Sequence, residues 1–212
     1  MAAASIRFTS KSKVPIMSVL LIAGSPSERS RTAALLRAVG ERLSLRGAQV
    51  SELRVRDLSP QALLLADFSH PSVLQATAQV AAADVLVVAT PVYKAAYSGV
   101  LKVFLDVLPQ DALKGKTVLP LATGGSPHHM LALDYALRPV LQSLGAKNIL
   151  PGIYATDAQV VLNPEEGYTI APDISARLDE AVNSLVDDKL WRTFSNAGRF
   201  SPVPFSQVRC SV

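Results

Sequence analysis

The segment from Gly24 to Thr32, GSPSERSRT, combines hydroxyl and guanidinium groups in a short stretch. Its candidate ligands for an anion are Ser25, Ser30, Arg31 and Thr32. An apolar run precedes the segment and a helical pattern follows it. It would therefore add the free N–H groups and positive dipole of a helix start to these side chains. This combination suits a phosphate monoester, which carries roughly two negative charges at neutral pH.

Two better-known phosphate motifs do not match this segment. It lacks the Gly-Lys-Ser/Thr of a Walker A loop and the GxGxxG of a classical dinucleotide fold. A serine at this place also serves as an ordinary helix cap without any ligand. Phosphate binding is the better interpretation, because it accounts for the arginines as well as the hydroxyls.

A second segment, TPVYKAAYSG (residues 90–99), could contact a planar ligand. Pro91 restricts the backbone directly after an apolar run, and Tyr93 and Tyr97 offer flat faces and hydroxyls. A plain alternative is that these tyrosines cover a sheet edge or a partner. The residues alone do not choose between the two.

A third segment, ATGGSPHH (residues 122–129), has paired glycines that allow a ligand close to the backbone. A metal site built from His70, His128 and His129 is the rival interpretation. Adjacent histidines point in different directions, and no cysteine or carboxylate lies at ligand spacing from them, so no metal is expected. No Ser-His-Asp or Cys-His spacing supports nucleophilic catalysis.

Strand-like and helix-like patterns alternate along most of the chain. The expected strands are residues 18–23, 49–55, 84–90, 116–123 and 148–154; the expected helices are 32–46, 73–83, 98–108, 129–144 and 172–191, with a short one from Pro60. This alternation predicts an α/β fold with a parallel sheet covered on both faces. Ligands of such sheets bind beyond the carboxyl ends of the strands, where all three segments would lie.

Composition limits the other functional classes. Of 212 residues, 49% are apolar and 18% charged, which permits a full-sized core and argues against disorder. The net charge of +4 is mild and the basic residues are spread out, so no nucleic-acid partner is expected. No apolar run has the length of a membrane span. The single cysteine, Cys210, fits a reducing cytoplasm.

One domain is expected over residues 17–191. Residues 1–16 are rich in serine and basic residues and lack acids, and they are expected to form a disordered extension. Residues 192–212 are polar with two prolines and are expected to be a mobile tail.

Three motifs together resemble the NADPH-dependent FMN reductases of the flavodoxin-like superfamily. They are LIAGSPSERSRTAALL, VVATPVYKAAYSGVLK and LPLATGGSPHHMLALDYAL. The resemblance runs from about Met17 to Gln159 and is nearest to the FMN reductases of alkanesulfonate monooxygenase two-component systems. It implies a three-layer sandwich around a five-stranded parallel sheet.

The resemblance also implies site residues. Ser25, Ser30, Arg31 and Thr32 would hold the FMN phosphate; Pro91, Val92 and Tyr93 would line the isoalloxazine ring; Thr123, Gly124 and Gly125 would touch its other edge. Hydride would pass from the nicotinamide C4 to the flavin N5. The cofactors carry this chemistry, so no catalytic side chain is implied.

The implied activity is reduction of FMN by NADPH or NADH, with reduced flavin released to a partner monooxygenase of alkanesulfonate or other organosulfur metabolism. Homo-oligomers, dimers or tetramers, are also implied. The alternatives are a quinone or azo reductase with tightly held FMN, a flavodoxin-type electron carrier, and a non-enzymatic scaffold. The mildly basic charge disfavours the electron carrier, because such carriers have acidic surfaces.

The stretch LDYALRP (residues 133–139) carries a further implication of the resemblance. In this family an inserted tyrosine, here Tyr135, is associated with a π-helix turn at a subunit interface and with flavin as a substrate. The residues agree, because apolar positions cover more of this helix than one core-facing stripe needs, and Pro139 lacks an N–H. A kinked core helix is the alternative.

Three features depart from the family pattern: the extension at residues 1–16, the basic tail, and Glu28 in the first segment. A carboxylate near a phosphate would repel it unless the side chain turned outward. The role of Glu28 is therefore open.

Overall fold

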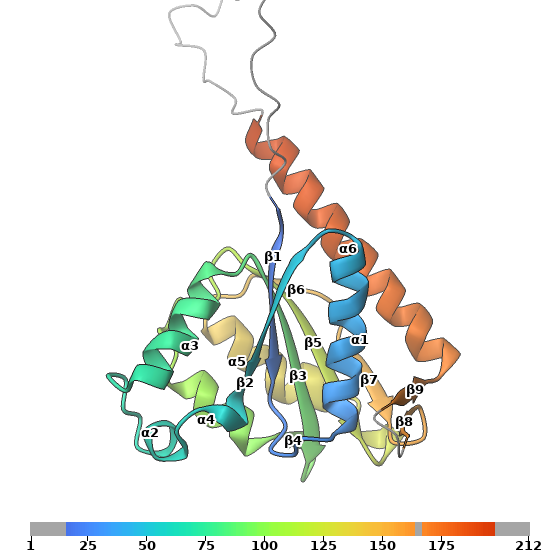
Figure 1. The fold of residues 1–212 in the computed structure, drawn as a ribbon, viewed down its shortest axis with the longest axis horizontal. Coiled ribbons are helices and arrows are strands. Elements are labelled where there is room, and N and C mark those ends of the chain that lie inside the picture. Colours follow the sequence, from blue (N-terminus) through green and yellow to red (C-terminus); the bar gives the residue numbers. More distant parts are fainter. Residues whose placement is uncertain (1–15, 164–166, 198–212) are drawn as a thin grey trace, which may run out of the picture.

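A parallel β-sheet forms the centre of the molecule (Figure 1). The computed structural model describes residues 16–163 and 167–197. All pairings among the strands of the main sheet's path are parallel. Their spatial order is β2 (Gln49–Arg54), β1 (Ser18–Ala23), β3 (Val85–Tyr93), β5 (Thr117–Gly124) and β6 (Asn148–Ile149).

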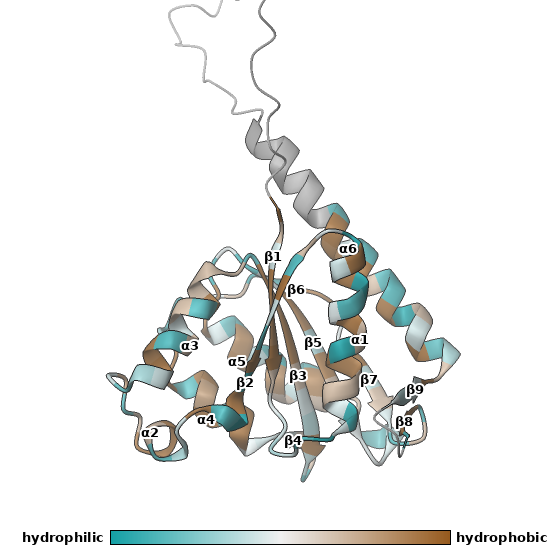
Figure 2. Ribbon diagram, viewed as in Figure 1, coloured by the Kyte–Doolittle hydropathy of each residue, from teal (hydrophilic) through white to brown (hydrophobic). Residues whose placement is uncertain are grey.

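Helices cover both faces of this sheet, because successive side chains of a strand point to opposite faces. In β1, Val19 and Leu21 belong to one apolar cluster, and Leu20 and Ile22 belong to the other. The first cluster includes residues of α1 (Arg31–Leu45) and α6 (Pro172–Ala197); the second includes α2 (Pro60–Leu64), α3 (Pro71–Ala82), α4 (Gly99–Asp106) and α5 (Arg138–Ser143). Figure 2 shows the apolar strands between these helices, whose colouring is mixed. The predicted three-layer α/β arrangement is confirmed.

The fifth strand is not continuous, and its prediction over residues 148–154 is wrong in this respect. β6 pairs with the first residues of β5, and β7 (Ile153–Thr156) pairs with the last ones. Pro151 lies in the gap between β6 and β7 and has no N–H to donate to the ladder. The strand is therefore interrupted and resumes two residues later.

A short antiparallel hairpin that the sequence did not suggest follows this strand. It consists of β8 (Val160–Leu162) and β9 (Tyr168–Ile170). Its apolar residues pack into the same cluster as α1 and α6. The hairpin thus lies beside the N-terminal half of α1 (Figure 1).

The last helix is longer than expected, because α6 runs to Ala197 rather than ending at residue 191. Residues 1–15 and 198–212, including Cys210, lie outside the described residues, so the expected disorder of the extension and of most of the tail stays a prediction. Among the described helices, none has both the length and the apolar character needed to cross a membrane.

Candidate functional site

The carboxyl ends of β1, β3 and β5 lie side by side, and we call this the carboxyl edge of the sheet. Ala23 pairs with Ala89, and Pro91 pairs with Thr123. The three segments selected from the sequence therefore come together at one edge, next to the start of α1 (Figure 1). The sheet brings together residues that are up to about 100 positions apart in the chain.

The first segment forms a turn that leads into α1. Ser30 is the N-cap, and its Oγ accepts a hydrogen bond from the N–H of Ala33 at 3.1 Å. Ser25 is buried, and its Oγ accepts from the N–H of Ser27 at 3.2 Å. The first turn of α1 contains no acidic residue. Capping by serine and an electropositive helix start thus occur together here.

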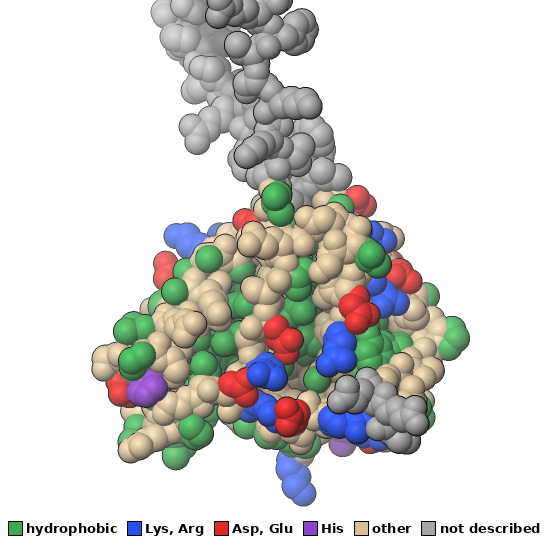
Figure 3. Space-filling view, in the orientation of Figure 1, with side chains coloured by type: hydrophobic (Ala, Val, Ile, Leu, Met, Phe, Trp, Pro, Cys, Tyr) green, Lys and Arg blue, Asp and Glu red, His purple; other side chains and the backbone are tan. Residues whose placement is uncertain are grey.

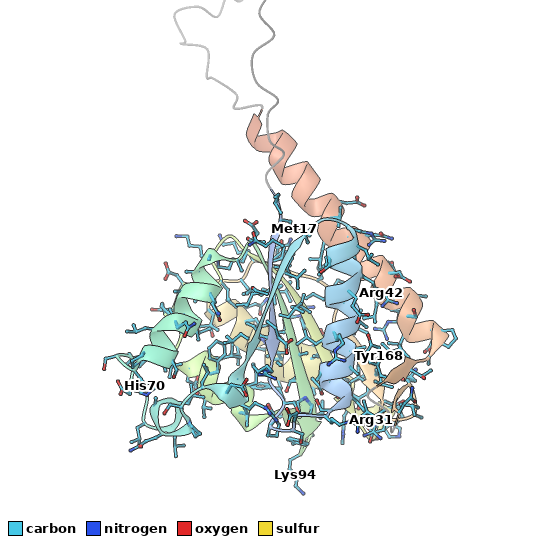
Figure 4. All side chains as sticks on the ribbon, in the orientation of Figure 1. Met17, Arg31, Arg42, His70, Lys94 and Tyr168 are labelled. Atoms are coloured by element: carbon cyan, nitrogen blue, oxygen red, sulfur yellow. The ribbon has the colours of Figure 1, made fainter. Side chains whose placement is uncertain are left out.

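The two arginines of this turn point toward the β8–β9 hairpin. Arg31 donates from Nε to the carbonyl of Val160 at 3.1 Å and lies 3.6 Å from the Asp157 carboxylate (Figure 4). Arg29 donates to the carbonyl of Asn163. The Arg31 side chain is nevertheless 41% exposed. To contact a phosphate, the Arg31 guanidinium would therefore either keep its bond to the β8–β9 hairpin at the same time or give that bond up.

Glu28 pairs with Arg56 beside the helix start. Its side chain is 76% exposed and lies 3.5 Å from the guanidinium of Arg56. It borders an open groove of about 590 Å³ along the N-terminal half of α1 and the end of β2. Figure 3 shows basic and acidic side chains intermingled on this face. Ser25 and Ser30 line the same groove, so the Glu28 carboxylate lies beside the expected phosphate subsite, and its pairing with Arg56 offsets part of its charge there.

The second segment is a hairpin, because the strand expected to end at residue 90 continues beyond it. β3 continues to Tyr93 and turns back as β4 (Ala96–Tyr97). Lys94 and Ala95 form the turn with φ values of +50° and +66°, a left-handed conformation that is costly for residues with a Cβ. Lys94 extends away from the body of the protein (Figure 4).

The predicted ring-lining residues of this hairpin differ in accessibility. Pro91 and Val92 are buried, whereas Tyr93 is half exposed. Burial raises the pKa of the neighbouring Tyr97 above its ordinary value. Among these residues, Tyr93 is the one that offers a side-chain surface to a ligand.

The third segment begins where β5 ends. Thr123 is buried, and a Cβ on Gly124 would lie 2.5 Å from the Tyr154 hydroxyl, so a side chain there would displace Tyr154. A Cβ on Gly125 would have its nearest neighbour at 3.8 Å, so this backbone is open to approach. Tyr154 donates to the carbonyl of Ser126 at 2.6 Å, and burial raises its pKa.

The two histidines that follow lie in a 3₁₀ turn, Pro127–His129. Over residues 16–163 and 167–197, no group of three side chains has the arrangement of a metal site. His70 is used elsewhere, because its Nδ1 accepts from the N–H of Ser72 at the start of α3. As the N-cap of α3, His70 precedes a helix that begins at Pro71, two residues before the predicted start at residue 73.

Buried hydroxyls connect the three segments. Thr32 and Thr123 share a hydrogen bond of 2.6 Å between their Oγ1 atoms. Ser98 donates from Oγ to the carbonyl of Gly24 at 2.5 Å. The N–H of Ser98 donates to Thr90 Oγ1 at 2.9 Å. Ser98 and Thr90 were not among the predicted site residues, although a serine before a helical pattern marks Ser98 as an N-cap.

The predicted helix over residues 129–144 is interrupted. Residues Leu133–Leu137 form a π-helix, in which the N–H of Arg138 bonds to the carbonyl of Leu133. Pro139 follows directly and has no N–H for the carbonyl of Tyr135, which disturbs the regular ladder. Tyr135 is 78% exposed, and Met130 and Leu131 are half exposed beside it.

The FMN implied by the sequence resemblance fits this edge. Its phosphate matches a helix start without acidic residues, next to hydroxyls and Arg31. Its planar ring matches the exposed Tyr93 and the open backbone at Gly125. The segments for the phosphate and for the ring follow adjoining strands, because β1 pairs with β3 and β3 pairs with β5.

Comparison with known proteins gives one consistent family. The model of the NADPH-dependent FMN reductase family matches residues 17–161. An FMN reductase (NADPH) of Escherichia coli (strain K12) is 46% identical over 168 residues, covering 79% of this chain and 87% of that protein. An FMN reductase (NADPH) of Pseudomonas putida KT2440 is 53% identical over 144 residues, covering 68% and 73%.

Solved structures agree with this result. The apo form of the NADH:FMN oxidoreductase EMOB is similar with a TM-score of 0.72 and 43% identity, covering 79% of this chain and 87% of that one. A flavodoxin of Streptococcus pneumoniae TIGR4 has a TM-score of 0.56 at 13% identity, covering 81% and 99%, so it shares only the fold. The flavodoxin-like architecture predicted from the sequence is confirmed.

Proposed function

This chain belongs to the NADPH-dependent FMN reductase family, and from that membership we propose that it reduces FMN with NADPH or NADH. The observation that carries the proposal is the meeting of the three segments at the carboxyl edge, with a helix start free of acidic residues. When bound, FMN supplies the ring that accepts a hydride from the nicotinamide. The protein binds, positions and shields the two reactants.

The phosphate is held at the start of α1 by backbone N–H groups together with Ser25, Ser30, Arg31 and Thr32. Two contacts within the protein support this assignment. Ser30 orders the first turn as its cap, and the Glu28 carboxylate is paired with Arg56. The helix dipole adds a favourable interaction for an anion at this point.

The isoalloxazine ring lies against the β3–β4 hairpin and the third segment. Tyr93 supplies an exposed aromatic face, while Pro91 and Val92 supply backbone from a buried strand end. Thr123, Gly124 and Gly125 lie on the opposite side, where the glycine backbone leaves room. No side chain acts as a proton donor in this proposal, because a hydride transfer needs none.

Reduced flavin is released to a flavin-dependent monooxygenase. The relatives include an NADH-dependent FMN reductase, SfnE, of Pseudomonas putida, 32% identical over 178 residues, covering 78% of this chain and 91% of that protein. Open access at Gly125 and the exposed Tyr93 support a flavin that enters and leaves rather than one that is enclosed. The partner acts in oxidation of alkanesulfonates or related organosulfur compounds.

The protein assembles into dimers or tetramers through exposed apolar surface. One such surface combines Met130, Leu131 and Tyr135 on and before the π-helix, all more than half exposed. Large contiguous apolar surface on a monomer marks an association site. A second surface, on α2, α3 and the connection between them, contains Leu64, Leu65, Phe68 and Leu74.

The test is steady-state oxidation of NADPH and NADH by the purified protein with varied FMN, FAD and riboflavin. We expect saturable dependence on FMN as a second substrate and little flavin in the protein as purified. No NAD(P)H oxidation with excess FMN would refute the proposal. A yellow protein with ping-pong kinetics and quinone or azo-dye turnover would replace flavin release by a bound prosthetic group.

A further inference from the structure

A buried serine lies between the phosphate and ring parts of the carboxyl edge. Ser98 is 1% exposed and follows β4, at the point where the hairpin enters α4. Its hydroxyl accepts from the N–H of Leu101 at 3.1 Å, which makes it the N-cap of α4. The same hydroxyl donates to the carbonyl of Gly24, 74 positions earlier in the chain.

Gly24 is the first residue of the phosphate segment, and it is held on both sides. Its N–H donates to the carbonyl of Ala89 at 2.8 Å, and its own carbonyl accepts from Ser98. A Cβ at this position would lie 2.8 Å from the Cβ of Leu101 and 2.9 Å from the Ala89 oxygen. Gly24, at the beginning of the phosphate segment, therefore has little freedom to move relative to β3 and α4.

The ring part is attached to the same point. The N–H of Ser98 donates to Oγ1 of Thr90, and that hydroxyl donates to the carbonyl of Pro91 at 3.0 Å. Thr90 is fully buried. The bond between Ser98 and Thr90 thus closes the base of the β3–β4 hairpin that carries Tyr93, and the same Ser98 holds Gly24.

We propose that Ser98 is a positioning residue that sets the distance between the phosphate subsite and the ring subsite of the flavin site. The inference rests on the proposed function, because it needs one ligand that occupies both subsites. Ser98 acts through Gly24 and the hairpin and does not itself touch the flavin. The affinity for FMN depends on this distance because FMN has both a phosphate and a ring. Riboflavin has the ring alone, so its affinity does not.

The experiment measures the dissociation constants of FMN and riboflavin by quenching of flavin fluorescence, in the wild-type protein and in Ser98→Ala. We expect the preference for FMN over riboflavin to fall roughly three- to tenfold in Ser98→Ala, the equivalent of one net hydrogen bond. The riboflavin constant should stay unchanged within error. Ser98→Thr, which keeps the hydroxyl, should retain the wild-type preference.

Ser59→Ala is the matched control. Ser59 caps α2 through the N–H of Ala62 at 3.3 Å, and α2 contains no residue of the three segments. Its loss should lower thermal stability and leave both flavin constants unchanged. If Ser98→Ala does not fold, Ser98→Gly takes its place, because glycine retains most of the stability of an N-cap while lacking the hydroxyl.

Two results would overturn the inference. One is an equal weakening of both flavins in the Ser98 variant, which would show a general loss of structure. The other is an unchanged FMN preference in a folded variant. A wild-type protein that binds neither flavin would overturn the proposed function together with this inference, so the two failures are distinguishable.

Discussion

The two sides of the carboxyl edge are built in different ways. On the phosphate side, formed by residues 24–32 with Ser98 and Thr123, buried hydroxyls bind backbone and one another over long sequence distances. On the π-helix side, formed by Met130, Leu131 and Tyr135, large side chains are exposed on an irregular backbone. The same edge thus combines a tightly bonded half with an apolar and open half.

This difference corresponds to two tasks of a flavin reductase. A phosphate is recognised by fixed donors, and fixed donors need a backbone whose position is determined by buried hydrogen bonds. The exposed apolar side chains of the π-helix side instead offer a surface for association with a second copy of the chain. The comparison predicts that changes on the phosphate side alter stability and flavin affinity together, and that changes on the π-helix side alter association.

The largest effect is expected for Gly24→Ala on the phosphate side. Its Cβ would clash with Leu101 and with the carbonyl of Ala89, neither of which is a flexible side-chain end. We expect the free energy of unfolding to fall by roughly 2–4 kcal/mol, measured by urea denaturation, with loss of FMN binding. Gly99→Ala is the control, because nothing lies within 4 Å of a Cβ there. Equal stability of the two variants would show that the phosphate side yields to a Cβ at Gly24 and is not held rigidly.

A smaller effect is expected for Thr32→Val, which preserves shape but leaves the buried hydroxyl of Thr123 without its 2.6 Å partner. We expect a loss of about 1–3 kcal/mol in the free energy of unfolding without flavin. The double variant Thr32→Val, Thr123→Val should recover most of this loss, because no hydroxyl is then left unpaired. Additive losses in the double variant would contradict a direct bond between the two segments.

An alkaline pH dependence is expected from Tyr154, which supports the third segment. Burial raises its pKa above the ordinary value of 10.0, so folding favours the protonated phenol. Its contribution to stability is therefore present below pH 10 and is lost as the pH rises through the folded pKa. Tyr154→Phe should lose about 1 kcal/mol at neutral pH, with the bond to Ser126, and should show a weaker alkaline decline in urea denaturation.

The exposed Tyr93 provides the comparison for that prediction. Tyr93→Phe should change the free energy of unfolding by less than about 0.5 kcal/mol, because the side chain is half exposed. An alkaline decline in Tyr154→Phe equal to that of the wild-type protein would show that another group causes it.

The fold and the location of the site follow from the sequence because their signals are local. A continuous apolar run such as residues 18–23 is typical of a strand buried on both faces, and the segment after it must then lie at the carboxyl edge. The pattern failed where one residue changed the geometry. Pro151 divides the fifth strand. Lys94 and Ala95 form a tight hairpin turn without the Asn-Gly that signals one.

The contacts that organise the site were not predictable in the same way. The role of Ser98 depends on a carbonyl 74 positions away, and that of Thr32 on a hydroxyl 91 positions away. A serine or threonine looks the same in a sequence whether it caps a helix, connects two loops or contacts a ligand. Only the packed sheet decides among these roles.

The smallest effect on stability, and the clearest contrast between the two sides, is expected for Tyr135→Ala. The side chain is 78% exposed, so its removal should change the free energy of unfolding by less than about 0.5 kcal/mol. If the π-helix side is a subunit contact, analytical ultracentrifugation should show a shift toward smaller species. Leu45→Ala, at an 89% exposed position on α1, is the matched control and should leave the assembly unchanged. A sedimentation profile that does not change in Tyr135→Ala would assign association to the surface on α2 and α3, and Phe68→Ala would then produce the shift.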